Sequence, residues 1–234
     1  MSVHSSIRTS TSTVFGRNHD AMLLIPKVCP RGRRVVAWAV GLGAGKNDSN
    51  IPSVFRAPFE HLELANALNS CAEDFRVYAM DSDENVVSRA RALLKSPRLT
   101  IPGSAHSRTE RWRNYLRTFS YQPVGPKKAV WAVPQRVRER ITILGPSNEG
   151  DVFSSMPHER PDLITCFHLA YHYANRGGNI LLNLLMRSLK PNGVLLVDDR
   201  TARIFHETLS SRMKRMPFSG TRGALPNSVF YVKK

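Results

Sequence analysis

The feature that most constrains the fold is a fully apolar run that is followed at once by glycines. The run is Val35-Val36-Ala37-Trp38-Ala39-Val40, and Gly41-Leu42-Gly43-Ala44-Gly45 comes directly after it. A continuous apolar run of this length is typical of a strand that is buried on both faces, as in a parallel sheet. Parallel strands need crossover connections, so the rest of the chain should alternate strands with helices.

The remaining sequence follows this alternation. Further strands are predicted at 75–80, 141–144, 163–166 and 194–197. Helices are predicted from about Pro58, after Ser82 or Asp83, over 180–189 and from about Ala202. The segment 229–232 alternates less cleanly, and we expect it to pair antiparallel at the sheet edge. The pattern predicts an α/β fold with a mainly parallel sheet and an antiparallel C-terminal edge strand.

The domain organisation follows from where the rhythm begins and where it breaks. We interpret 1–31 as a flexible, basic, Ser/Thr-rich N-terminal tail and 32–234 as one domain. The rhythm is lost from about 96 to 130, a basic, Pro/Gly-rich stretch that contains Trp112 and Tyr115. We expect an insertion there with some helix of its own, because such a length is unusual for a plain loop.

Charge and cysteine content bound the partners and the compartment. Lys and Arg outnumber Asp and Glu by 34 to 18, a net charge of +16. This indicates an acidic macromolecular substrate, protein or RNA, although the scattered charge is also compatible with a role in solubility. Three cysteines without a CxxC pair favour reduced thiols and a cytoplasmic location. The N-terminus leaves an export or transit segment open, and no apolar run is long enough to span a membrane.

The glycine run suits three ligands that approach a backbone closely: a nucleoside triphosphate, a dinucleotide or S-adenosylmethionine. A phosphate loop would need glycine at Val40 and a hydroxyl residue at Asn47. The dinucleotide fingerprint would need glycine at Lys46. We therefore assign Gly41, Gly43 and Gly45 to a cofactor without choosing it from the glycines alone.

Polar residues follow the second and third strands as well. Asp81 ends the second strand, where a carboxylate accepts hydrogen bonds from ribose hydroxyls, and the alternative is a helix cap. Asn148 and Asp151 follow the third strand and are candidates for binding an adenine amino group, although an ordinary loop is an equal alternative.

The end of the fourth strand carries the most chemistry. Cys166-Phe167-His168-Leu169-Ala170-Tyr171-His172-Tyr173 places histidines and tyrosines just past a buried strand. We predict that His168 and Leu169 contact the cofactor and that Tyr171, His172 and Tyr173 form the catalytic wall. Packing is the alternative for the tyrosines. Two histidines four residues apart suit a metal, but a third ligand with suitable spacing is missing, so we predict none.

These stretches together resemble the CheR-type methyltransferases of chemotaxis receptors. The resemblance covers Arg33 to Val232 and is carried by four segments: 36–45, 75–91, 115–143 and 162–196. It implies a Rossmann-like class I methyltransferase fold, S-adenosylmethionine as cofactor, and a protein side chain as methyl acceptor.

The sequence also departs from that family. Lys46-Asn47-Asp48 stands where the family has acidic residues and a Pro-Tyr-Ser helix start, and Phe167-His168 replaces its Arg-Asn pair. The family's tyrosine near the methyl group aligns with His172. A shorter segment, 167–174, resembles the messenger-RNA cap guanine-N7 methyltransferases. Three hypotheses therefore stay open: a protein methyltransferase, an RNA methyltransferase, and a degenerate fold that only binds the cofactor.

Overall fold

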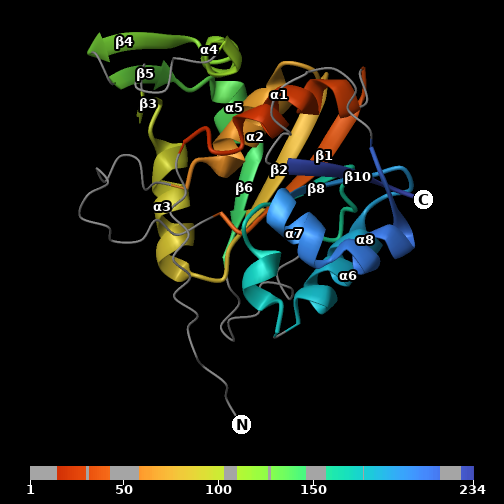
Figure 1. Cartoon of the computed structure of the whole chain (residues 1–234). Helices are drawn as coiled ribbons and strands as arrows, with labels where there is room; N and C mark the ends of the chain where they lie inside the picture. Colours follow the sequence, from red (N-terminus) through yellow and green to blue (C-terminus); the bar gives the residue numbers. More distant parts are fainter. Residues whose placement is uncertain are drawn as a thin grey trace.

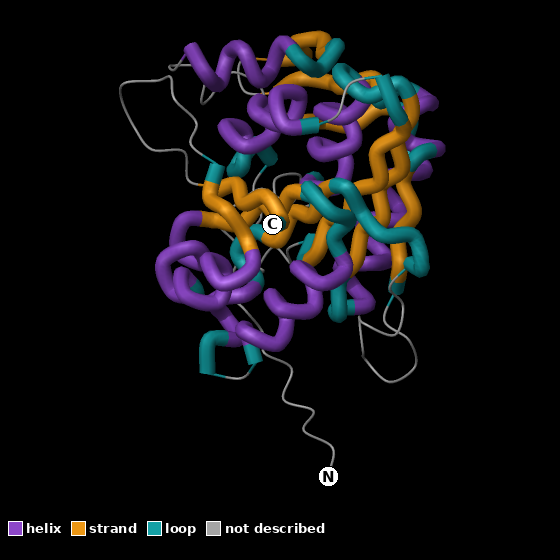
Figure 2. The backbone as a smooth tube through the Cα atoms, turned by 90° about the vertical axis from the view of Figure 1, so that its right-hand side faces the viewer, coloured by secondary structure: helices purple, strands orange, loops and turns teal. Residues whose placement is uncertain are grey.

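The computed structural model describes residues 15–29, 32–42, 58–102, 110–125, 128–145, 157–175, 177–216 and 228–234. A seven-stranded sheet with the order β6-β2-β1-β7-β8-β10-β9 forms its centre. Its strands are β1 (Arg34–Val40), β2 (Asp74–Met80), β6 (Ile141–Leu144), β7 (Leu163–Cys166), β8 (Val194–Asp198), β9 (Met213–Arg215) and β10 (Ser228–Lys233). Figure 2 shows the strands between two groups of helices.

The central strands are parallel, as the apolar runs predict. β1 pairs with β2 on one side and with β7 on the other, while β2 also pairs with β6 and β7 with β8. Every residue of β7 and β8 is buried, and only Arg34 of β1 is exposed. Because the four parallel pairs point the same way, the carboxyl ends of these strands share one edge.

The C-terminal strand is antiparallel, as predicted, but it is not the outermost one. β10 pairs with β8 and with β9, both antiparallel, so the short β9 forms the edge. The sequence did not predict β9, because three residues directly after a helix are too few to show an alternation of apolar and polar residues.

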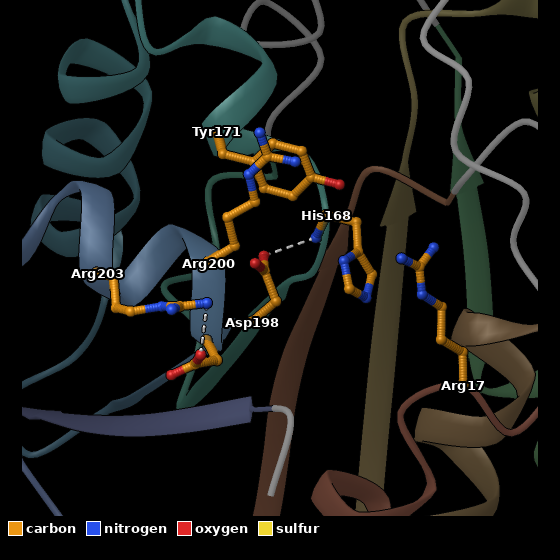
Figure 3. A pocket seen from close by; sticks show the side chains of 7 residues that line it. Arg17, His168, Tyr171, Asp198, Arg200 and Arg203 are labelled. Carbon is orange, nitrogen blue, oxygen red and sulfur yellow. Dashed lines mark hydrogen bonds and ion pairs between the residues drawn. The ribbon is translucent and has the colours of Figure 1, made fainter.

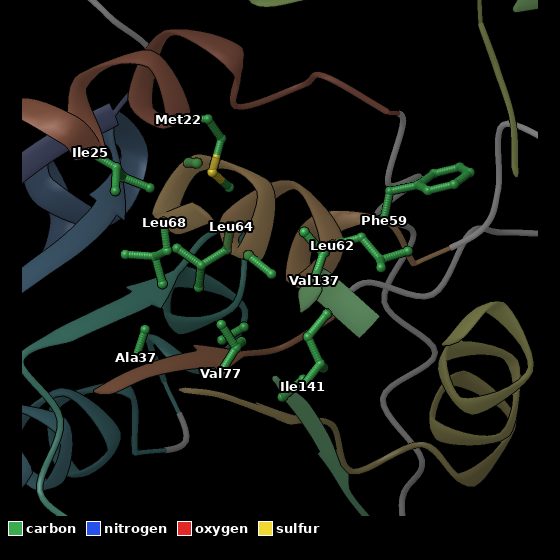
Figure 4. Close-up of a cluster of buried hydrophobic side chains, with 14 of the residues drawn as sticks. Met22, Ile25, Ala37, Phe59, Leu62, Leu64, Leu68, Val77, Val137 and Ile141 are labelled. Atoms are coloured by element: carbon green, nitrogen blue, oxygen red, sulfur yellow. The ribbon is translucent and has the colours of Figure 1, made fainter. Parts of the chain in front are cut away.

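Helices cover both faces, and β1 shows how the sequence divides the core between them. Val35, Ala37 and Ala39 pack with the first group of helices, and Val36, Trp38 and Val40 pack with the second. The first group contains α1 (His19–Val28), α2 (Glu60–Asn69), α3 (Glu84–Lys95) and α5 (Gln135–Glu139). The second contains α6 (Gly178–Ser188), α7 (Asp199–Ile204) and α8 (His206–Arg212). Figure 4 shows Leu64 and Leu68 of α2 close to Val77.

The segment between α3 and β6 forms a second, smaller sheet. It consists of β3 (Arg98–Pro102), β5 (Lys128–Ala132) and β4 (Tyr121–Gly125), all antiparallel, and α4 (Glu110–Arg117) lies beside it (Figure 1). Tyr115 and Phe119 turn inward, and Phe119 meets Trp131 edge to face. This aromatic packing fastens the insertion to the main domain.

The N-terminal region differs from the flexible tail that the sequence predicts for residues 1–31. Residues 15–28 pack against the domain: α1 buries Ala21, Met22 and Ile25, and Phe15 contacts the rings of Phe59, Tyr115 and Phe119. The sequence did not predict this packing. The preceding residues are rich in Ser and Thr, and the apolar residues of α1 form only a short stripe. Residues 1–14 lie outside the described part of the chain.

A buried glutamate connects this N-terminal segment to the insertion. Glu63 of α2 accepts hydrogen bonds through Oε1 from the Gly16 amide, at 2.8 Å, and from the Tyr115 hydroxyl. Burial raises the pKa of Glu63 from 4.5 to about 7, although both hydrogen bonds lower it. At neutral pH a large share of this carboxyl is therefore protonated in the folded protein.

We expect this pKa to appear in the pH dependence of stability. The unfolded chain loses the Glu63 proton near pH 4.5 and the folded chain near pH 7, so the free energy of unfolding falls as the pH rises between them. Glu63→Gln keeps an acceptor oxygen but cannot titrate. Relative to this variant, wild type should lose at least about 1 kcal/mol between pH 4.5 and 7, measured by urea unfolding. Parallel curves for the two proteins would contradict the shifted pKa.

Candidate functional site

The site is built where β1 ends in Gly41. Gly41 has a φ of +80°, and its amide donates to the Met80 carbonyl at 2.9 Å. A Cβ at this position would lie 2.9 Å from Leu169 Cδ2, so glycine is needed both for the backbone conformation and for the close approach of the β7 loop. The turn at Gly41 and Leu42, called the glycine turn below, is therefore packed directly against Leu169 in the loop after β7.

Asp81 lies next to this turn and holds it. Its Oδ2 accepts from the Leu42 amide at 2.8 Å, and its Oδ1 accepts from the Asp83 amide at 2.9 Å. The helix cap of α3 is Asp83, which accepts from the Asn85 amide. Asp81 is thus not the α3 cap.

Four of the predicted cofactor residues cannot be placed. Gly43 and Gly45 of the glycine run and Asn148 and Asp151 after β6 lie outside the described residues. Their assignment to the glycine turn and to the adenine side stays a prediction.

The loop after β7 is held by Asp198 at the end of β8. The His168 amide donates to Asp198 Oδ2 at 2.8 Å, and His168 has the uncommon φ of +55°. The other contacts of this carboxylate are the Thr201 amide on Oδ1 and the Thr201 hydroxyl on Oδ2, which cap α7. Asp198 is only 2% exposed, so one buried carboxylate fixes both the loop and the start of α7.

A pocket of about 320 Å³ opens beside this carboxylate. Figure 3 shows His168 and Arg17 on one side of Asp198 and the paired side chains of Tyr171 and Arg200 on the other. The residues that line the pocket are Arg17, His168, Tyr171, Asp198, Asp199, Arg200 and Arg203. The volume suits a side chain or a small ligand.

Positive charge prevails in this pocket. The Arg200 guanidinium lies over the Tyr171 ring, 4.4 Å from its centroid, and no carboxylate of the described residues forms an ion pair with it. Arg203 pairs with Asp199 at 3.0 Å, and the oxygens of Asp198 already accept three hydrogen bonds. Such a site favours an anionic group between its arginines.

The titratable groups of the pocket are tuned by burial and by these arginines. Burial, and next the charge of Arg17, lower the pKa of His168 to about 4, so this imidazole is neutral at pH 7. Its Nε2 is buried and has no hydrogen-bond partner in the part of the chain that the structure describes. Burial and the charge of Arg200 lower the pKa of His172 too, while burial raises the pKa of Tyr171.

The three residues predicted to form the catalytic wall do not share one wall. They lie on a short 3₁₀ helix (Ala170–Tyr173), in which consecutive side chains point about 120° apart. Tyr171 lines the pocket, and His172 stacks on it with ring centroids 4.2 Å apart. Tyr173 lies toward the second strand, because a hydrogen bond to Ser82 and the charge of Asp81 both act on its hydroxyl. Their catalytic roles stay predictions.

Several residues of the site were missed by sequence reasoning. Asp198 and Arg200 follow a correctly predicted strand, so the strand-end rule that selected Asp81 could have selected them. Arg17 belongs to the segment that the sequence placed in a tail. Glu60, the first residue of α2, is buried among these strand ends, and an acidic residue at a helix start is normally interpreted as favourable to the helix dipole.

Two further searches concern other kinds of site. Among the described residues, no three His, Cys, Asp or Glu side chains are grouped so that they could hold a metal ion. In the same part of the chain, every helix is too short or too polar to cross a lipid bilayer.

Known proteins resemble this chain in structure rather than in sequence. Neither protein-family models nor curated protein sequences match it. An O-methyltransferase from Bacillus cereus, solved in complex with SAH, superposes with a TM-score of 0.50 at 11% identity and covers 93% of this chain and 80% of its own. The chain has the fold of the Rossmann-like methyltransferases.

Two further solved structures superpose with lower TM-scores. A SAM-dependent O-methyltransferase from Thermotoga maritima has a TM-score of 0.48 at 13% identity, covering 95% of this chain and 67% of its own. Precorrin-6y C5,15-methyltransferase from Geobacter metallireducens has a TM-score of 0.46 at 13% identity, covering 92% and 88%.

Proposed function

We propose that this protein is an S-adenosylmethionine-dependent methyltransferase that methylates an anionic acceptor. The observation that carries the proposal is the order of sites along one sheet edge. The glycine turn and Asp81 stand at the ends of β1 and β2, and the arginine-lined pocket stands at the ends of β7 and β8. In open α/β sheets a ligand binds where the connections diverge to opposite faces, here between β1 and β7.

The residues on the β1–β2 side fit the nucleoside of this cofactor. Asp81 offers carboxylate oxygens at the place where ribose hydroxyls are bound, and Gly41 brings backbone close without a side chain. A carboxylate here disfavours a ribose 2′-phosphate by charge repulsion. The fold of the SAH-bound O-methyltransferase supports the same cofactor, since the likeness spans 93% of this chain.

The β7–β8 side fits an acceptor that carries negative charge. Arg17, Arg200 and Arg203 line the pocket, and Tyr171 supplies a flat apolar wall beneath Arg200. When bound, the cofactor supplies a methyl group on a positively charged sulfur. The work of the pocket is to orient an acceptor oxygen in line with that methyl, and positioning of this kind accounts for a large part of catalysis in displacement reactions.

A carboxylate acceptor agrees best with the groups present, because it needs no general base. This is the acceptor that the CheR-type resemblance implies, so a carboxylate on a protein side chain is our specific proposal. The neutral His168 and His172 are then positioning or wall residues. An RNA acceptor is less well supported, because Tyr115, an aromatic residue of the basic insertion, is buried and hydrogen-bonded to Glu63 and so cannot stack on a base.

The arginine over Tyr171 gives a direct test of the acceptor. We expect Arg200→Gln to lower kcat/KM for the acceptor about tenfold, as for a lost charge-assisted hydrogen bond, and to leave cofactor affinity unchanged. Arg203→Gln is the matched control, because Arg203 is already paired with the exposed Asp199 and should matter less.

The assay is transfer of a labelled methyl group to protein and RNA fractions, followed by mild alkali. A protein carboxyl methyl ester would release its label as methanol, whereas a methylated base would keep it. Label that stays in RNA would overturn the protein acceptor, and an Arg200→Gln protein with the kcat/KM of wild type would remove Arg200 from the acceptor site. Binding of the cofactor without transfer to any fraction would indicate the degenerate fold.

A further inference from the structure

A buried carboxyl group with an unused acceptor stands in the middle of the strand ends. Glu60 is the first residue of α2 and is 3% exposed, and its Oε1 is buried without a hydrogen-bond partner among the described residues. A buried acceptor of this kind costs free energy unless a donor reaches it. Neither the packing of α2 nor the proposed acceptor pocket explains why an apolar residue does not stand here.

The charges that act on Glu60 show where its carboxyl lies. Asp81 at the end of β2 and Asp198 at the end of β8 both interact with it, and its own charge in turn affects Cys166 at the end of β7. Since β1 and β7 lie between β2 and β8 in the sheet, these three partners surround the point where the connections diverge. Glu60 therefore lies between the ribose side and the acceptor pocket.

The surroundings of this carboxyl are acidic. Among the described residues, the charges that act on it are those of three carboxyl groups, Glu63 on its own helix and Asp81 and Asp198 at the strand ends, and of the guanidinium of Arg17. Negative charges that converge in a buried place favour a cationic ligand group. Because Glu60 Oε1 can still accept a hydrogen bond, we expect this cationic group to carry an N–H donor.

From this geometry we infer that Glu60 Oε1 binds the α-ammonium group of the methyl donor, an inference that rests on the proposed function. S-adenosylmethionine has two positive groups, but its sulfonium has no N–H, whereas its ammonium has three. Binding of the ammonium would satisfy Oε1 and would direct the amino-acid part of the cofactor toward α2. The transferable methyl would then lie on the side of the acceptor pocket.

The inference has a consequence for protons. Burial and the charge of Glu63 raise the pKa of Glu60, with Asp81 and Asp198 adding to the effect and Arg17 opposing it, so the protonated form of this carboxyl is favoured. An ammonium beside the carboxyl favours its ionised form, so binding should release a proton. Affinity should consequently rise with pH. His61, with a pKa of about 3, stays neutral throughout.

Calorimetric titration of the full chain at pH 7, in two buffers of different ionisation enthalpy, tests this. The probes are S-adenosylhomocysteine, which keeps the ammonium but lacks the sulfonium charge, and methylthioadenosine, which lacks the amino-acid part. In Glu60→Gln we expect S-adenosylhomocysteine to bind at least about tenfold more weakly without proton release, and methylthioadenosine to bind as in wild type. Glu60→Met, which removes the acceptor altogether, should reproduce the loss.

Glu63→Gln is the matched control, because Glu63 is equally buried one turn along the helix but already accepts from Gly16 and Tyr115. Because the Glu63 charge helps to raise the pKa of Glu60, this variant should reduce the proton release without abolishing it, and the affinity for S-adenosylhomocysteine should fall much less than in Glu60→Gln. Unchanged affinity and proton release in a folded Glu60→Gln protein would overturn the inference and leave the proposed function standing. If neither S-adenosylhomocysteine nor S-adenosylmethionine bound wild type, the proposed function itself would fail, and the inference with it.

Discussion

Asp198→Ala is expected to lower the free energy of unfolding by roughly 3–5 kcal/mol, the largest effect that we predict for any single residue. The carboxylate accepts from the His168 amide at 2.8 Å, from the Thr201 amide at 2.9 Å and from the Thr201 hydroxyl at 2.7 Å. Alanine leaves these donors without a partner in a place that is 2% exposed to water. It also removes the helix cap of α7.

Two further variants separate the contributions. Asp198→Asn keeps the shape and one acceptor oxygen, but its amide nitrogen replaces the other oxygen and cannot accept. At least one of the three donors then loses its partner, so we expect a loss of stability that is smaller than that of Asp198→Ala. Thr201→Val removes only the hydroxyl and should cost about 1 kcal/mol. Urea unfolding of all three measures this, and an Asp198→Ala protein as stable as wild type would show that the carboxylate does not hold the loop.

Asp81→Ala is expected to weaken cofactor binding about 5- to 150-fold, the equivalent of roughly 1–3 kcal/mol for lost charge-assisted hydrogen bonds. Two effects act together. The carboxylate no longer accepts from ribose hydroxyls, and the Leu42 amide of the glycine turn loses its partner at 2.8 Å. The second effect was not foreseen from the sequence and favours the upper part of the range.

The neighbouring Asp83 provides the control for this prediction. Asp83→Ala removes the cap of α3 and should cost about 1 kcal/mol of stability, but Asp83 holds no part of the glycine turn, so cofactor affinity should stay close to wild type. Calorimetric titration with S-adenosylmethionine compares the two variants. An Asp81→Ala protein that folds and binds with unchanged affinity would remove Asp81 from the site.

The fold could be predicted because its strands carry a strong local signal. The run at 35–40 becomes β1 within one residue, and the other parallel strands also lie where their apolar runs predict. A strand that is buried on both faces gives a nearly continuous apolar run, which is easily distinguished from the more polar segments on either side of it. The antiparallel C-terminal strand was predicted as well, whereas β9 and α1 were missed because their patterns are short.

The site could be predicted only where function follows directly from a strand end. Asp81 and His168 were selected in this way, and both lie at the carboxyl edge of the sheet. The pocket depends on Arg17, which lies about 180 residues from Arg200 in the chain and reaches the same pocket only because α1 packs against the domain. The sequence also did not predict the 3₁₀ helix after β7, in which the side chains of Tyr171 and Tyr173 point in different directions.

The most direct test of the central claim is calorimetric titration of the wild-type chain with S-adenosylmethionine, with NAD and ATP as comparison ligands. The account predicts saturable one-to-one binding of S-adenosylmethionine, and binding of the other two that is at least about tenfold weaker. The reason is that Asp81 and the glycine turn suit an unphosphorylated nucleoside, whereas the acidic groups around Glu60 repel phosphates. Binding of NAD or ATP in preference to S-adenosylmethionine, or no binding of S-adenosylmethionine at all, would contradict it.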